Sequence, residues 1–146
     1  MNIINSQAFN ASFYQNTINA PISFNGVGIH SGKAVNMTLF PADDDLGIVF
    51  KRTDLDKNNY IKAIPENIDF SKYCSKLKNK HGVYVNTVEH LLATLHSFDI
   101  NNILIEINSP ELPAMDGSSY EFTKKLLEVG LQIQKKPKKV LKILNK

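Results

Sequence analysis

The sequence contains a single cysteine, Cys74, among its 146 residues. One cysteine excludes a disulfide within the chain and is typical of proteins in a reducing compartment. No apolar run approaches the roughly 20 residues that a membrane-spanning helix needs. The segment Met1–Asn19 is rich in Asn and Ser and lacks the basic start and apolar run of a signal peptide. We therefore expect a cytoplasmic protein without a membrane span.

The chain also has little excess charge. Its net charge is +3, with 21% charged and 42% hydrophobic residues, which fits one globular domain with a modest core. The basic segment Lys135–Lys139 suggests a further function class, a module that binds nucleic acid. However, the charge is small and the sequence supplies no aromatic platform on which bases could stack. We therefore expect no nucleic-acid partner.

Short alternating segments predict most of the strands. They lie at Ile18–Phe24, Ala34–Phe40, Ile48–Arg52, Tyr60–Ile64, Ser71–Leu77 and Val83–Val85. Pro21 would place the first of these at a sheet edge or a bulge. The continuous apolar run Ile103–Ile107 is typical of a buried strand.

Two segments predict helices. The first follows Thr87, a residue type that can cap a helix, and ends near Phe98–Asp99. Its apolar residues recur at i, i+3, i+4 and i+7 and should face the core: Val88, Leu91, Leu92 and Leu95. The second follows Asp116–Ser119, where Asp116 should hold the turn, and ends at Gly130.

Many short strands with only two helices indicate an α+β fold, with both helices on one face of a small, mostly antiparallel sheet. We expect residues 1–16 to form a loosely held N-terminal arm and residues 17–134 to form the domain. Residues 135–139, a lysine-rich stretch around Pro137, have the composition of a linker. The apolar run within 140–146 resembles the first strand of a second domain that is missing from this chain.

Glu89 and His90 are the strongest candidates for chemistry. They fall in the first turn of the first helix, off its apolar stripe, where the helix dipole favours an anionic carboxylate and a neutral imidazole. A metal site with a general base requires that combination. Taken alone, however, each residue also has an ordinary interpretation, as a first-turn histidine and as a glutamate that complements the dipole.

Several sequence blocks occur together in one order: Gly26–Lys33 (GVGIHSGK), Ile48–Leu55 (IVFKRTDL), Asn86–Ala93 (NTVEHLLA), Asn101–Ile103 (NNI), Pro110–Pro113 (PELP) and Met115–Ser118 (MDGS). With these blocks the chain closely resembles the N-terminal half of the UDP-3-O-acyl-N-acetylglucosamine deacetylases, the zinc enzymes of lipid A biosynthesis. The resemblance runs from about Thr17 to the end of the sequence. It implies one half of a two-domain enzyme, with the helices of two similar domains packed together and the active site between them.

The resemblance also implies roles for particular residues. His90 would be a zinc ligand, and Glu89 would be the general base for the water that hydrolyses the N-acetyl group of the UDP-sugar acyl substrate. His30 would help to bind substrate. Tyr73 and Cys74 match a segment beside the metal whose backbone lines the acyl passage. In their ordinary interpretation, His30 is a hydrogen-bonded turn residue and Cys74 a small buried hydrophobe.

One feature separates this chain from a complete enzyme of that kind. A catalytic zinc ion takes about three protein ligands and a water, whereas this sequence offers one convincing ligand, His90. The resemblance places the other ligands, in a His-Lys-x-x-Asp block, in the missing C-terminal domain. We therefore expect the chain alone to be inactive. A non-catalytic fragment or binding module of the same fold is the alternative.

Two further points follow from the sequence. An inverted-zincin metallopeptidase would need His-x-x-Glu-His, and Asn86 stands where the first histidine is required. The two remaining histidines, His81 and His96, are expected at the surface.

Overall fold

The computed structural model describes residues 13–139. Within them the chain forms ten strands, two α-helices and a short 3-10 helix. The elements are β1 (Tyr14–Ile18), β2 (Ile22–Val27), β3 (Ala34–Pro41), β4 (Ile48–Arg52), β5 (Tyr60–Lys62), η1 (Pro65–Asn67), β6 (Ile68–Asp69), β7 (Lys76–Lys78), β8 (Tyr84–Asn86), α2 (Glu89–Ser97), β9 (Ile103–Ile107), α3 (Tyr120–Val129) and β10 (Leu131–Pro137).

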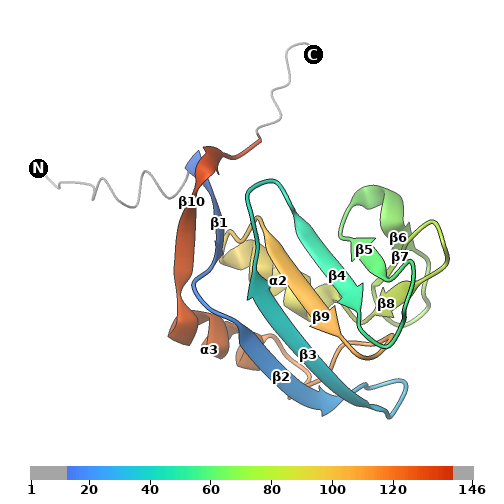
Figure 1. Ribbon diagram of the computed structural model, residues 1–146. Helices are drawn as coiled ribbons and strands as arrows, with labels where there is room; N and C mark the ends of the chain where they lie inside the picture. The colour runs from blue at the N-terminus through green and yellow to red at the C-terminus, as the bar shows by residue number, and fades with distance from the viewer. Residues whose placement is uncertain (1–12, 140–146) are drawn as a thin grey trace, which may run out of the picture.

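The centre of the molecule is a five-stranded sheet in the order β2-β3-β9-β4-β5. The pair β4–β9 is parallel and the other pairs are antiparallel. Helices α2 and α3 both lie behind this sheet in Figure 1, on the same face. The structure thus confirms the predicted α+β class. No helix among the described residues is long and apolar enough to cross a membrane.

The core forms where the sheet meets the helices. Neighbouring strands align a row of fully or nearly fully buried side chains across the sheet: Ile22, Leu39, Ile105, Phe50 and Ile61. The next residues along the strands point to the opposite face, where Lys51 and Glu106 form an ion pair at 2.8 Å. Period-two alternation of this kind buries one face of the sheet under the helices. The other face carries this ion pair together with Val49, which is 4% exposed, and half-buried Leu104.

A smaller sheet, β6-β7-β8, lies beside the end of β4 and leads into α2. Arg52, at the end of β4, is only 6% exposed. Its guanidinium donates to both carboxylate oxygens of Asp54 at 2.7 and 2.6 Å and to the backbone oxygen of Tyr84 in β8 at 2.8 Å. The bidentate pair satisfies the buried cation and ties the two sheets together just before α2 begins.

Some of the predicted strand boundaries are wrong. The strand expected at Ile18–Phe24 is two strands, β1 and β2, that belong to different sheets. Between them, the Asn19 N–H donates to the Gly130 backbone oxygen, and Pro21 has no N–H to give to a ladder. The strand expected at Tyr60–Ile64 ends at Lys62.

The strand expected at Ser71–Leu77 is present only as β7, Lys76–Lys78. The backbone just before β7 is used elsewhere. The Ser75 N–H donates to the Glu89 carboxylate, and the Ser75 oxygen accepts from the Thr87 N–H. Residues 71–75 therefore fold against the start of α2 instead of extending the sheet.

Strands β1 and β10 pair with each other in an antiparallel ribbon that the sequence patterns did not predict. Residues 14–16 thus belong to a strand, and β10 continues through Pro137 into the expected linker. Buried Asn102 ties the ribbon to the domain, because its Nδ2 donates to Gln15 Oε1 and to Gln134 Oε1, both at 2.7 Å. The domain division itself stays a prediction, and the stretch 140–146 lies outside the described residues.

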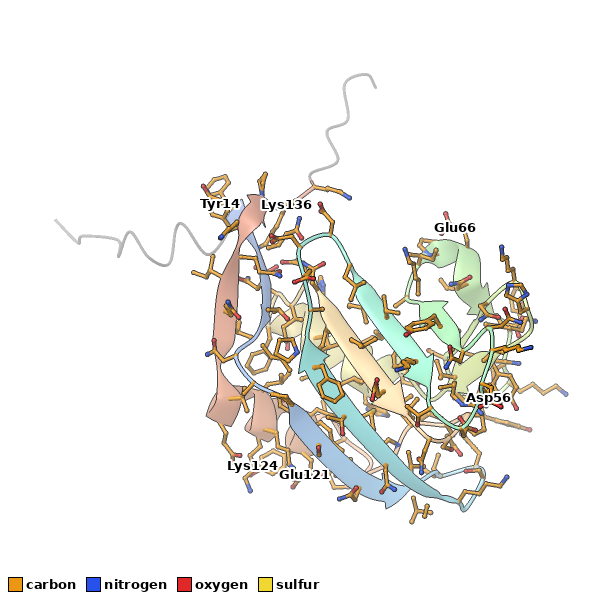
Figure 2. All side chains as sticks on the ribbon, viewed as in Figure 1. Tyr14, Asp56, Glu66, Glu121, Lys124 and Lys136 are labelled. Atoms are coloured by element: carbon orange, nitrogen blue, oxygen red, sulfur yellow. The ribbon has the colours of Figure 1, made fainter. Side chains whose placement is uncertain are left out.

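Asp45 gives a test of how this ribbon is held. Its carboxylate accepts from Lys136 at 2.7 Å and from Gln15 at 2.9 Å. Figure 2 shows Lys136 near Tyr14 at the tip of the ribbon. The hydrogen bond from Lys136, followed by that from Gln15, lowers the pKa of Asp45 to about 2.

A depressed carboxyl pKa contributes stability that is present above the ordinary value of 3.8 and is lost as the pH falls through about 2. We expect the carboxyl carbon of Asp45 to titrate near pH 2 in an NMR experiment. The protection of the β1 and β10 amides, measured against the intrinsic exchange rate at each pH, should fall over the same interval. A midpoint near 3.8 in the folded protein would contradict the Lys136 contact.

Candidate active site

Glu89 and His90 lie where the sequence places them, in the first turn of α2. Helix α2 is held by buried Val88, Leu91 and Leu95, as the apolar spacing predicts. The expected cap is wrong. Val88 occupies the N-cap position without a side-chain cap, and Thr87 adopts a left-handed conformation with φ of 60°. The chain turns sharply there between β8 and α2, so the Thr87 hydroxyl points elsewhere, to Glu111.

The Glu89 carboxylate is anchored by one backbone group. Its Oε2 atom accepts from the Ser75 N–H at 3.0 Å. This bond uses one of the two carboxylate oxygens and connects α2 to the segment that contains Tyr73 and Cys74. The backbone thus fixes the orientation of a half-buried carboxylate at the N-terminus of this helix.

The His90 backbone and side chain link α2 to the turn before α3. Its backbone oxygen accepts from the Ser119 hydroxyl at 3.2 Å. Asp116 lies near enough to the His90 imidazole to interact with it electrostatically. Hydrogen bonds from the Ser118 N–H and hydroxyl are the main reason that the pKa of Asp116 falls below its usual value, and the imidazole adds to this effect. As predicted, Asp116 holds the turn before α3.

The other predicted site residues gather near the same helix start. The exposed rings of His30 and Tyr73 face each other at a tilt of 33°, with their centroids 6.5 Å apart. Cys74 is half-buried and its Sγ lies 3.3 Å from the Ser71 hydroxyl. The structure thus brings segments far apart in the sequence together around Glu89. The remaining histidines, His81 and His96, are exposed, as expected.

One residue of this cluster was missed by the sequence reasoning. Glu111 is 2% exposed, and its carboxylate accepts from the backbone N–H groups of His30 at 2.9 Å and Ser31 at 2.8 Å. The PELP block contains Glu111 and is one of the blocks that carry the resemblance, so a signal was present. Nothing local in that block indicates that its carboxylate would be buried against the His30 turn.

The described residues do not form a complete metal site. No group of three His, Cys, Asp or Glu side chains among residues 13–139 is arranged to hold a metal ion. His90 has the right chemistry for a single zinc ligand. Any zinc site that includes His90 would therefore need donors from outside this part of the chain.

Comparisons with known proteins show the family of the chain. Residues 15–146 match the model of the LpxC family, UDP-3-O-acyl N-acetylglycosamine deacetylase. A UDP-3-O-acyl-N-acetylglucosamine deacetylase of Francisella tularensis subsp. tularensis (strain WY96-3418) is 47% identical over 132 residues, which are 89% of this chain and 46% of the relative. The corresponding enzyme of Thermodesulfovibrio yellowstonii is 48% identical over 131 residues, which are 89% of this chain and 44% of the relative.

The α+β domain therefore falls in the class of deacetylases, by the family model that it matches. The chain belongs to the UDP-3-O-acyl N-acetylglycosamine deacetylase family, since the family match covers nearly all of it. The chain spans about half the length of the curated relatives it matches.

Proposed function

We propose that this chain is the N-terminal half of a zinc-dependent deacetylase that removes the N-acetyl group of UDP-3-O-acyl-N-acetylglucosamine in lipid A biosynthesis. The observation that carries the proposal is the Glu89–His90 pair at the start of α2, in a chain 47% identical to a deacetylase of that name. The proposed location is the cytoplasm.

Glu89 is proposed as the general base. One of its oxygens is oriented by the Ser75 N–H, and the other is then able to accept the proton of a water that attacks the acetyl carbonyl. The products are acetate and a free amine on the sugar. A zinc ion held in part by His90 would lower the pKa of that water and polarise the carbonyl. The leaving amine also needs a proton, which the resemblance assigns to a histidine in the other half of the enzyme.

His30, Tyr73 and Cys74 are proposed to contact the substrate. The exposed rings of His30 and Tyr73 lie with their centroids 6.5 Å apart, and aromatic side chains of this kind can pack against a sugar or base ring. The Tyr73–Cys74 backbone leads directly to the Ser75 N–H that holds Glu89. Substrate contacts in this segment would therefore be coupled to the orientation of the base.

A site with one metal ligand among the described residues supports a dependence of the activity on donors from a second domain. Two large apolar side chains of α3, Tyr120 and Leu127, are 61% and 68% exposed, which supports a further protein surface covering this helix. The same single ligand favours the second candidate, a non-catalytic fragment or binding module of the same fold. The two candidates differ in whether the missing half restores turnover.

The test compares the chain alone with the chain fused to the part of the Francisella tularensis deacetylase that it does not match. We expect the chain alone to bind zinc weakly and to release no acetate from UDP-3-O-acyl-N-acetylglucosamine. The fusion should hold one zinc ion and turn over. A fusion that folds and binds zinc but releases no acetate would favour the binding module. Stoichiometric, tight zinc binding by the chain alone would contradict the shared site.

A further inference from the structure

Glu111 joins three segments of the candidate site. Its Oε1 accepts from the His30 N–H at 2.9 Å, and its Oε2 accepts from the Ser31 N–H at 2.8 Å. The Thr87 hydroxyl donates to the same Oε1 at 3.3 Å. Glu111 thus connects its own loop, the turn that carries His30 and the residue two positions before Glu89.

The backbone around Glu111 reinforces this arrangement. The Asn86 N–H donates to the Pro110 oxygen at 2.8 Å, and the Leu112 N–H donates to the Asn86 oxygen at 3.1 Å. The loop therefore runs beside the end of β8, where the two segments form a parallel bridge. Thr87 follows immediately in a left-handed conformation that is unfavourable for a β-branched residue. The Glu111 loop lies where the chain must be held in that conformation.

The turn is also closed tightly around the carboxylate. A Cβ atom added to Gly28 would lie 2.4 Å from Glu111 Oε2 and 2.4 Å from the Ser31 hydroxyl. Such distances are far inside van der Waals contact, so any larger residue at this position would displace the Glu111 carboxylate and the Ser31 hydroxyl. The Gly28 backbone completes the turn by donating to the Lys33 oxygen at 3.0 Å.

The electrostatics of the pocket fit an ionised carboxylate. Burial raises the pKa of Glu111, but hydrogen bonds from the Ser31 hydroxyl and from the N–H groups of His30 and Ser31 outweigh it, so the pKa lies below its usual value. Backbone N–H groups that converge on an oxyanion form an anion-binding nest. Here the nest binds a side chain of the same protein. A buried charge is a costly way to gain stability, which favours a role in setting geometry.

We propose that Glu111 is a positioning residue that locks the His30 turn to the start of α2 and so sets the place of His30 relative to Glu89. The locking itself is a property of this chain. Its consequence for catalysis rests on the proposed function, in which Glu89 is the base and His30 contacts substrate. Loss of the lock would let the substrate-binding turn move away from the base, and turnover would suffer more than binding.

The first arm of the test uses the chain itself and needs no activity. In Glu111→Gln, an amide NH2 group replaces one carboxylate oxygen. The backbone N–H that donated to that oxygen then faces another donor, and its hydrogen bond is lost. Amide exchange at His30 and Ser31 should accelerate about ten- to a hundredfold, the factor expected when hydrogen bonds to a charged group are lost. Exchange in β3 should stay as in the unchanged chain. Glu106→Gln, which removes a carboxylate from the exposed sheet face, is the matched control.

The second arm uses the fusion with the Francisella tularensis part. Glu111→Gln should lower kcat at least about tenfold, with KM and zinc content close to those of the unchanged fusion. A merely structural role would lower the folded fraction, and with it kcat and zinc content together. Thr87→Val removes only the hydrogen bond from the Thr87 hydroxyl to Glu111, and it is the variant to use if Glu111→Gln does not fold. It should lower kcat without changing exchange at His30, whereas Thr87→Ser should behave like the unchanged protein.

The outcomes separate the two proposals. Unchanged exchange at His30 and Ser31 in a folded Glu111→Gln chain would overturn the lock. Unchanged kcat in an active Glu111→Gln fusion would overturn its part in catalysis. Faster exchange in the chain, together with an unchanged fusion that never releases acetate, would leave the lock standing and contradict the proposed deacetylase function instead.

Discussion

In the fusion described above, Glu89→Gln should abolish nearly all acetate release while leaving the zinc content unchanged. The Gln amide keeps the shape of the side chain, and its oxygen can still accept from the Ser75 N–H. An amide, however, cannot accept the proton of the attacking water, and general-base catalysis contributes about 10²- to 10⁴-fold. Turnover should fall by that factor. Acetate release and zinc content, measured on the same preparation, are the two readouts.

His90→Ala should fail differently, because it removes a metal ligand. Zinc content and turnover should fall together, and added zinc should restore little of either. His96→Ala is a matched control, since His96 is an exposed histidine in the same helix. Equal zinc loss in Glu89→Gln and His90→Ala would contradict the separate roles of base and ligand. Full activity in His90→Ala would contradict the proposal that His90 binds a catalytic zinc ion.

Much of the central fold could be predicted from local patterns. Strands β3, β4 and β9 lie within one residue of their expected bounds, because each buries one face under the helices and so alternates or is continuously apolar. The two helices also occur where their spacing predicts. In these elements the local pattern and the tertiary packing require the same residues, so the pattern is sufficient.

The ribbon of β1 and β10 could not be predicted in this way. Its strands are more than 110 residues apart in the sequence, since Asn16 pairs with Ile133. Polar groups, above all the amide of buried Asn102, tie the ribbon to the domain. Gln15 and Gln134 carry no hydrophobic signal, and their burial depends on partners that meet only in the folded chain. Propensity and alternation do not detect contacts of this kind.

The candidate site was predicted in the same uneven manner. Glu89 and His90 are adjacent in sequence and stand at a recognisable helix start, so the pattern and the resemblance both led to them. Thr87 was misassigned as a cap, because its left-handed conformation is set by the junction of β8 and α2. Glu111 was missed, because its burial depends on a turn 80 residues earlier. Residues that orient other residues leave little local signal.

Because α2 rests on the central sheet, the largest stability effect is expected there, at Ile105. This residue is fully buried in β9, between Leu39 of β3 and Phe50 of β4. Ile105→Ala removes three carbons from a close-packed centre that cannot collapse without moving strands on both sides. The expected loss is about 2–5 kcal/mol. Since domains have a total stability of about 5–15 kcal/mol, the variant would be partly unfolded at modest denaturant.

Leu104→Ala is the matched control, since Leu104 precedes Ile105 in the same strand, is half-buried and lies on the opposite face of the sheet. Its truncation should cost clearly less, because less apolar surface returns to water and no enclosed cavity forms. Urea unfolding followed by circular dichroism gives both free energies, with similar denaturant slopes expected for the two variants. Equal losses for Leu104→Ala and Ile105→Ala would mean that the opposite sheet face is also packed against protein. The greater enclosure assigned to Ile105 than to Leu104 would then be wrong.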